Sequence, residues 1–276
     1  MNAGALIAGI PGAPTVMLIH GLASSYRVWD KVVPKIETEA NIVAAQLESD
    51  HSIERDADDA AALLRSPTVI VGHSRGGLVA TALAERHPAL VSALLLLCPP
   101  WSQASRLSAR TPSERVLAVP GVGELMWAMA SPERQRAAQQ SAFGPSVTVP
   151  DQFVADLRAR GRRNVVRSTR AIDTYLGART LADRLTSLPL PTELVFGELD
   201  ARVASPASEF AELRHATVRT LPGVGHTPPW EAPDVVADVI GRTLRSTTAA
   251  TATDPGPGRR TPRRGRRRSG GSGDVG

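Results

Sequence analysis

An apolar, β-branched run leads into the pentapeptide Gly72-His73-Ser74-Arg75-Gly76, and a second apolar segment with helical spacing follows. This order is typical of a sharp turn between a buried strand and a helix, which lifts the central serine above the edge of a sheet. We expect a strained backbone at Ser74, and glycines at 72 and 76 because a side chain there would meet the neighbouring strand or helix. The pentapeptide therefore predicts an α/β fold with Ser74 as a candidate nucleophile.

Short apolar runs bounded by Gly, Pro or Asp predict six strands, and segments with helical periodicity lie between most of them. The expected strands are 15–19, 41–46, 69–71, 93–97, 192–196 and 217–221. The expected helices are 53–64, 77–86, 206–213 and 233–244. Alternation of this kind favours a mostly parallel sheet that is flanked by helices on both faces.

The alternation stops between Pro99 and Leu190, where no convincing strand is found. Helical patterns cover 113–119, 124–130, 132–141, 151–160 and 164–184, and Gly177 marks a candidate break in the last of them. We interpret this stretch as a helical lid inserted over the carboxyl edge of the sheet. The expected division is a core of 1–98 and 191–245, a lid of 99–190, and a tail of 246–276.

A serine hydroxyl needs a base within hydrogen-bond reach, and that base needs a carboxylate to orient it. His226 follows the last predicted strand in a Gly- and Pro-rich loop, so it is the expected base. Asp200 lies just beyond the preceding strand and is the expected carboxylate, with Glu198 as the alternative.

The other histidines have less suitable positions. We expect His51, His87 and His215 to be solvated, and His73 to pack behind the turn that carries Ser74.

A developing oxyanion also needs donors. One is expected to be the backbone N–H of Arg75, directly after Ser74, and the other the N–H of Leu22, which follows a strand and Gly21. An ordinary glycine turn would explain Gly21 equally well.

Four segments together resemble the α/β-hydrolase superfamily in order and spacing, and most closely its lidded esterase and C–C hydrolase branches. They are residues 19–22, 72–77, 197–200 and 225–226, and the resemblance covers about residues 14–245. It implies a triad of Ser74, Asp200 and His226, an acyl-serine intermediate, and neither cofactor nor metal. Relatives that use an aspartate at this turn, the epoxide hydrolases and haloalkane dehalogenases, are disfavoured by Ser74. The stretch 46–52 departs from the family because it lacks the usual glycines.

The predicted activity is hydrolysis of a small carboxylic ester or lactone. Hydrolysis of a C–C bond or a thioester is the alternative, and a slowly turning-over receptor of the same fold is the rival from another class. Candidate pocket residues in the predicted lid are Trp101, Met126, Trp127 and Met129, although each could simply pack the lid onto the core. Six arginines between 158 and 170 are mostly expected in solvent, and one could meet a substrate carboxylate.

The basic charge of the chain is concentrated at its end. Residues 256–276 hold seven arginines and one acid, whereas the rest of the chain is nearly neutral. We expect the Arg/Gly/Pro-rich tail to be disordered, with weak contact to nucleic acid or an anionic surface as a lesser possibility. Cys98 is expected to be a small core side chain. The apolar stretches are too short to span a membrane and the N-terminus lacks basic residues, so a cytoplasmic location is expected.

Overall fold

The computed structural model describes residues 4–107, 112–206 and 208–253 and contains a seven-stranded sheet. The strand order is β1-β3-β2-β4-β5-β6-β7; β1 pairs with β3 in antiparallel orientation and all other neighbours are parallel. The strands are β1 Gly4–Gly9, β2 Thr15–Ile19, β3 Asn41–Gln46, β4 Thr68–His73, β5 Val91–Leu97, β6 Thr192–Gly197 and β7 Ala216–Leu221. The predicted mostly parallel α/β fold is confirmed.

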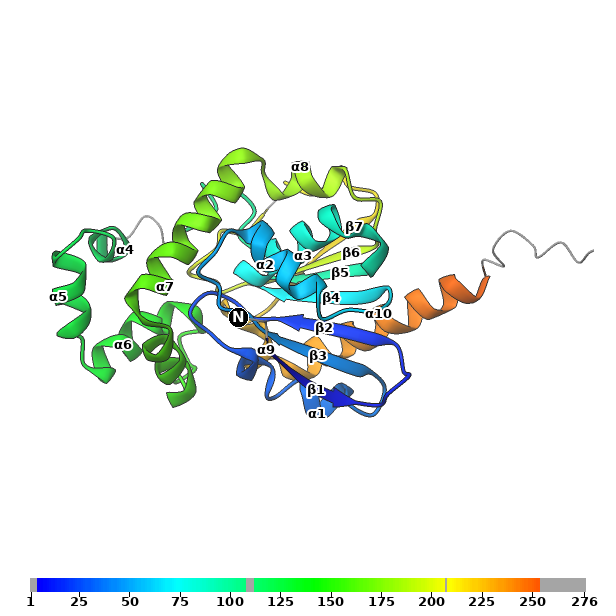
Figure 1. Ribbon diagram of the computed structural model, residues 1–276, viewed down its shortest axis with the longest axis horizontal. Helices are drawn as coiled ribbons and strands as arrows, with labels where there is room; N and C mark the ends of the chain where they lie inside the picture. The colour runs from blue at the N-terminus through cyan, green and yellow to red at the C-terminus, as the bar shows by residue number, and fades with distance from the viewer. Residues whose placement is uncertain (1–3, 108–111, 207, 254–276) are drawn as a thin grey trace, which may run out of the picture.

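Helices cover the two faces of the sheet (Figure 1), and each face packs into a hydrophobic core. On one face the strands pack against α2 (Ile53–Ala61), α3 (Arg75–Arg86) and α8 (Leu181–Thr186). On the other they pack against η1 (Tyr26–Trp29), α1 (Val33–Ile36) and α10 (Pro233–Thr253). β4 and β5 lie in the middle of the sheet and are buried on both faces, which explains their continuous apolar runs. Ser74 therefore directly follows a central strand whose residues are all buried.

In the described part of the segment between β5 and α8 there are four α-helices and the 3-10 turn η4, and they lie beyond the carboxyl ends of the parallel strands (Figure 1). They are α4 Pro112–Leu117, α5 Val122–Ala128, α6 Pro132–Gln139, η4 Gln140–Ala142 and α7 Asp151–Ala178. Helix α7 is interrupted at Gly161, whose φ of 75° is left-handed, so the two predicted helices meet there. The predicted break near Gly177 corresponds to the gap between α7 and α8.

The edge strand β1 was not predicted. Its residues Gly4–Gly9 are mostly exposed, and its glycines and alanines do not alternate with apolar residues. The strand is held by its pairing with β3, from Gly4 opposite Gln46 to Gly9 opposite Asn41. A strand that is stabilised mainly by backbone pairing leaves little trace in the pattern of side chains.

The predicted helix at 206–213 is wrong for the described residues, which form turns. The backbone N–H groups of Glu209, Ala211 and Leu213 each donate to the carbonyl three residues earlier, not four. Phe210 is buried in the core and holds this segment in place. A pattern of about two helical turns is too short to distinguish an α-helix from successive tight turns.

Helix α10 continues to Thr253, so the first part of the predicted tail is helical. The hydroxyl groups of Ser246, Thr247 and Thr248 bond to carbonyls one helical turn earlier, which satisfies them within the helix. Residues 254–276, where the arginines of the tail lie, are outside the described residues. In the described chain, no helix is both long and apolar enough to cross a bilayer.

Candidate active site

The turn between β4 and α3 places Ser74 in a left-handed backbone conformation, with φ 54° and ψ −120°. A Cβ at Gly72 would lie 2.3 Å from the carbonyl oxygen of Gly76, and one at Gly76 would lie 2.4 Å from that of Ile19. These contacts are shorter than any real side chain tolerates, so the two glycines are required by the close approach of α3 to β4 and β2. The half-buried Ser74 stands at the start of α3, as predicted.

Three side chains form a chain of hydrogen bonds at this point. The Nε2 of His226 lies 2.8 Å from Ser74 Oγ, and its Nδ1 lies 2.8 Å from Asp200 Oδ2. The side chains of His226 and Asp200 are only 5% and 3% exposed, so water scarcely competes for these bonds. The three residues come from loops after β4, β6 and β7, whose carboxyl ends share one edge of the sheet. The structure brings together the serine, base and carboxylate predicted from the sequence.

Asp200 is prepared to stay ionised. Burial opposes its charge, but His226 and the backbone N–H groups of Val203 and Arg202 outweigh burial and hold the pKa of this carboxyl below its usual range. The two N–H groups donate to Oδ1 over 2.9 and 2.7 Å, which leaves Oδ2 free to face His226. Glu198, the alternative carboxylate, is instead exposed and accepts from Gly223 N. The geometry therefore favours Asp200.

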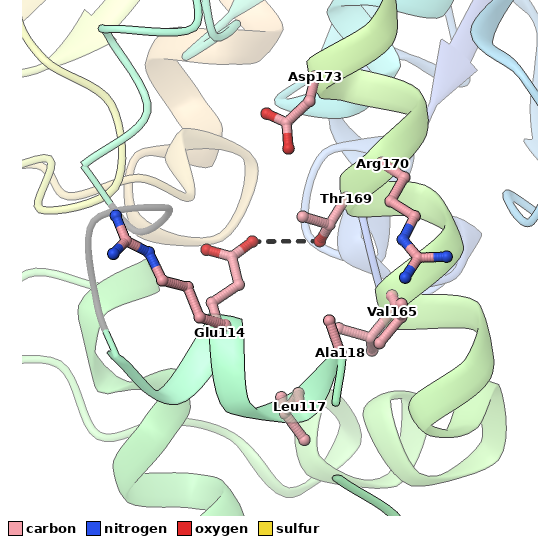
Figure 2. Close-up of a pocket in the computed structure, with 9 residues that line it drawn as sticks. Glu114, Leu117, Ala118, Val165, Thr169, Arg170 and Asp173 are labelled. Carbon is pink, nitrogen blue, oxygen red and sulfur yellow. Dashed lines mark hydrogen bonds between the residues drawn. The ribbon is translucent and has the colours of Figure 1, made fainter. Parts of the chain in front are cut away.

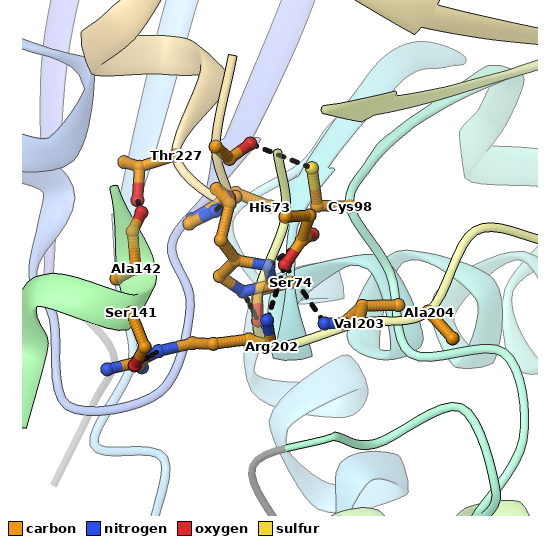
Figure 3. Close-up of polar contacts among 12 residues, drawn as sticks. His73, Ser74, Cys98, Ser141, Ala142, Arg202, Val203, Ala204 and Thr227 are labelled. Atoms are coloured by element: carbon orange, nitrogen blue, oxygen red, sulfur yellow. Dashed lines mark hydrogen bonds and ion pairs between the residues drawn. The ribbon is translucent and has the colours of Figure 1, made fainter. Parts of the chain in front are cut away.

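His73 packs behind the site, as expected. Its ring lies 5.3 Å from that of His226, and its Nε2 lies 2.8 Å from the His226 carbonyl oxygen (Figure 3). Burial, followed by the neighbouring His226, lowers the pKa of His73 to about 3. A neutral His73 donates from Nε2 to the carbonyl and so helps to hold the His226 backbone. His51 is exposed as predicted, whereas His87 and His215 are half-buried and bound to Asp58 and to the Leu185 carbonyl.

The loop after β2 lies against the serine. A Cβ at Gly21 would lie 3.2 Å from Ser74 Cβ, so Gly21 permits the close approach of the loop that carries Leu22. His20 anchors this loop: its Nδ1 lies 2.8 Å from the Gly21 carbonyl, and its Nε2 accepts from Leu47 N. Burial lowers the pKa of His20 to about 4, so it is neutral near pH 7. The loop that carries Leu22 is thus held beside Ser74.

Glu231 is a residue of this site that was not singled out from the sequence. Its carboxylate accepts backbone N–H groups from Gly225 (3.0 Å) and Thr227 (3.0 Å), the residues on either side of His226. It also accepts from Gly144 N (2.7 Å) in the segment before α7. One half-buried carboxylate thus holds the histidine loop and joins it to the helical insertion. In the sequence, the segment Trp230-Glu231-Ala232-Pro233 indicates only the start of the last helix and gives no role for the Glu231 carboxylate.

Replacement of Glu231 by glutamine should lower esterase kcat by about 10-fold, with a smaller change in KM. A glutamine keeps one carbonyl oxygen but places an NH₂ group against backbone donors, so at least one N–H loses its acceptor. The His226 loop would then be held less firmly. Steady-state kinetics on a neutral ester measures the change. The matched control is Glu198→Gln, which alters an exposed carboxylate that accepts from Gly223 N in the loop before His226. A kcat within twofold of wild type would show that Glu231 does not position His226.

Cys98, Asp200 and His226 place a sulfur, an oxygen and a nitrogen within 4.8 Å of one another, a spacing that a metal ion could use. Burial raises the pKa of the Cys98 thiol well above its usual range, and the Asp200 carboxylate adds to this effect. A thiol that stays protonated is a poor ligand, and the other two groups already bond to each other. These residues therefore suit a hydrogen-bonded site better than a metal centre. Cys98 is buried, as predicted.

The candidate pocket residues separate into two groups. Trp101 borders the Asp200 loop, because its Nε1 donates to the carbonyl of Ala204 over 2.9 Å. Met126, Trp127 and Met129 instead lie on or directly after α5, at the end of the insertion away from the sheet (Figure 1). Met129 is 65% exposed. Helix α5 packs against α4 and α7. The structure therefore does not bring these three residues to Ser74.

A pocket of about 260 Å³ lies inside the insertion, between α4 and α7 (Figure 2). Its walls combine apolar and charged side chains, among them Glu114, Leu117, Val165, Thr169 and Asp173. Glu114 accepts from the Thr169 hydroxyl, and Arg106 pairs with both Glu114 and Asp173. None of the predicted site residues lines this pocket. It is separate from the serine site.

Comparisons with known proteins agree with this architecture. The model of the "Alpha/beta hydrolase family" matches residues 16–239. A pimeloyl-[acyl-carrier protein] methyl ester esterase of Neisseria meningitidis is 27% identical over 228 residues, which is 77% of this chain and 86% of the relative. A monoacylglycerol lipase of Homo sapiens is 24% identical over 261 residues, 84% of this chain and 76% of the relative.

Solved structures share the fold at lower identity. A haloalkane dehalogenase from Bradyrhizobium elkani superposes with a TM-score of 0.73 and 21% identity, covering 90% of this chain and 95% of the other. The structure titled a putative lipase from Acinetobacter baumannii superposes with a TM-score of 0.68 and 20% identity, covering 90% of this chain and 92% of the other. Together with the sheet order and the turn at Ser74, the family match over residues 16–239 shows that the chain belongs to the alpha/beta hydrolase family.

Proposed function

We propose that this protein is a serine hydrolase that cleaves a small carboxylic ester through an acyl-serine intermediate. The observation that carries the proposal is the unbroken hydrogen-bond chain from Ser74 through His226 to Asp200, with both links at 2.8 Å. A neutral imidazole bonded in this way can accept the serine proton while the carboxylate stabilises the imidazolium. The names of the two sequence relatives, an ester esterase and a lipase, support an ester over other acyl bonds.

In the proposed reaction each step is assigned to a group of this chain. Ser74 Oγ attacks the ester carbonyl while His226 Nε2 takes its proton, and the oxyanion that forms is stabilised by the N–H groups of Leu22 and Arg75. His226 then returns the proton to the departing alcohol. A water molecule, deprotonated by the same imidazole, attacks the acyl-serine and releases the carboxylic acid. No cofactor takes part in this scheme.

In this proposal the insertion, residues 99–190, serves as a lid over the site and the segments 1–98 and 191–245 form the core. Contacts on two sides of Ser74 support it. Ser25, on the loop after β2, donates to Asp156 of α7 over 2.6 Å, and Thr227, next to His226, donates to the Ala142 carbonyl over 2.6 Å. The insertion is thus tied to both loops that flank the serine, and Trp101 at its base is a candidate wall of the pocket.

Steady-state turnover on a panel of neutral substrates tests the proposal. We expect many turnovers per site on short p-nitrophenyl and methyl esters, with lower kcat/KM on a matched thioester and on a C–C substrate with a ketone next to the scissile bond. A single turnover followed by a stable acyl-protein would instead favour the hypothesis that the protein is a slowly turning-over receptor. Faster cleavage of the C–C substrate than of every ester would contradict the ester assignment.

A further inference from the structure

Arg202 stands beside the proposed active site, and its guanidinium donates to one side chain among the described residues, that of Ser141. It follows Asp200 by two residues, and its backbone N–H donates to Asp200 Oδ1 over 2.7 Å. Its half-buried side chain leads to Ser141 of the insertion, where Nε donates to the hydroxyl over 3.1 Å (Figure 3). That bond occupies one of the five N–H groups of the guanidinium and leaves the two terminal nitrogens to other partners.

Three arginines in or beside the insertion have carboxylate partners. Arg106 pairs with Glu114 and Asp173, Arg162 with Glu124, and Arg167 with Asp50. For Arg202, in contrast, no carboxylate oxygen of the described residues lies within ion-pair distance of 4.0 Å. Asp200 and Glu114 act on it only from farther away. Arg202 is therefore a half-buried cation that has no direct counter-ion among the described residues, so its charge is available to an anion.

The position of Arg202 relates this charge to the reacting serine. Arg202 lies in the same loop as Asp200, and its side chain bonds to Ser141. The next residue, Ala142, accepts through its carbonyl from the hydroxyl of Thr227, which follows His226. Figure 3 shows the Arg202 side chain extending from beside Ser74 to Ser141 of the insertion. The positive charge reaches His73 as well, where it helps to lower the pKa. Arg202 thus lies where the proposed lid meets the site.

We propose that Arg202 binds a carboxylate carried by the substrate, so that the preferred substrates are anionic esters such as monoesters of short dicarboxylic acids. The inference rests on the proposed esterase function and narrows its substrate class. The two terminal nitrogens of a guanidinium match the two oxygens of a carboxylate in a planar, paired arrangement. Ser141 would hold the guanidinium in place through Nε.

Matched ester pairs test this inference. One member is the monomethyl ester of a dicarboxylic acid of four to seven carbons, and the other is the methyl ester of the neutral monocarboxylic acid of equal length. We expect wild-type kcat/KM to be higher on the monoester for at least one chain length. Arg202→Gln should lower kcat/KM on that monoester about 10- to 100-fold, the range of a charge-assisted pair, while changing the neutral ester by less than about threefold. Arg202→Lys should fall between the two. Arg167→Gln, which removes an arginine of the insertion paired with Asp50, should leave both values unchanged.

The outcomes separate the inference from the function beneath it. Equal losses on both esters in Arg202→Gln would overturn it, because Arg202 would then only hold the Asp200 loop. Wild-type hydrolysis of neutral esters without any preference for the monoesters would also overturn it and leave the proposed function standing. No hydrolysis of either ester would overturn both. Thermal unfolding of each variant shows whether a loss arises from the fold.

Discussion

Ser74→Ala should lower the kcat for ester hydrolysis by about 10³-fold or more. Without the hydroxyl no acyl-serine forms, and only the oxyanion donors and substrate binding remain to accelerate attack by water. The variant should fold normally, since Ser74 Oγ bonds only to His226 among the described residues and alanine occupies the same backbone conformation at similar cost.

Steady-state kinetics with thermal unfolding as a check measures this effect. Ser66→Ala, a change at an exposed serine just before β4, is the matched control and should behave as wild type. Retention of more than about a tenth of wild-type kcat in Ser74→Ala would mean that another group is the nucleophile.

His226→Ala should be nearly as damaging as Ser74→Ala, and the double variant should be little worse than either. Because Ser74 and His226 act in the same step, removing one of them when the other is already absent should hardly lower kcat further. Asp200→Asn should reduce kcat by about 10²- to 10⁴-fold, because the amide favours the wrong tautomer of the His226 ring and no longer stabilises its charged form.

Glu198→Gln is the matched control for Asp200→Asn, because Glu198 precedes Asp200 by two residues but faces Gly223. It should stay within about threefold of wild type. If Glu198→Gln were the more harmful of the two, Asp200 would lose its assigned role. Additive effects of the Ser74 and His226 changes would contradict a shared step.

Much of this architecture could be predicted because its signals are local. The β-branched run of β4 and the glycines around Ser74 lie in one short segment. A side chain at Gly72 or Gly76 would collide with backbone atoms, as the sharp turn in the sequence predicts. Each of the three residues in the hydrogen-bond chain follows a predicted strand. In a parallel sheet the carboxyl ends of the strands share an edge, so the topology alone brings such loops together.

The parts that were missed depend on contacts between distant segments. Strand β1 exists because β3 pairs with it, and its own sequence is weakly patterned. Glu231 is important through the backbone groups of Gly144, Gly225 and Thr227, which no side-chain pattern reveals. The direction in which α5 points its apolar residues depends on how α4 and α7 pack around it, so the predicted pocket role of Met129 could not be checked by spacing alone.

Covalent labelling with a fluorophosphonate followed by peptide mass mapping tests the central claim most directly. An activated serine displaces fluoride, so each molecule should gain one phosphonyl group on Ser74 Oγ, and esterase activity should fall in proportion to labelling. Ser74→Ala should take up no label, and His226→Ala should label far more slowly. A stoichiometric label on any other residue, or full esterase turnover in protein whose Ser74 is completely labelled, would contradict the account.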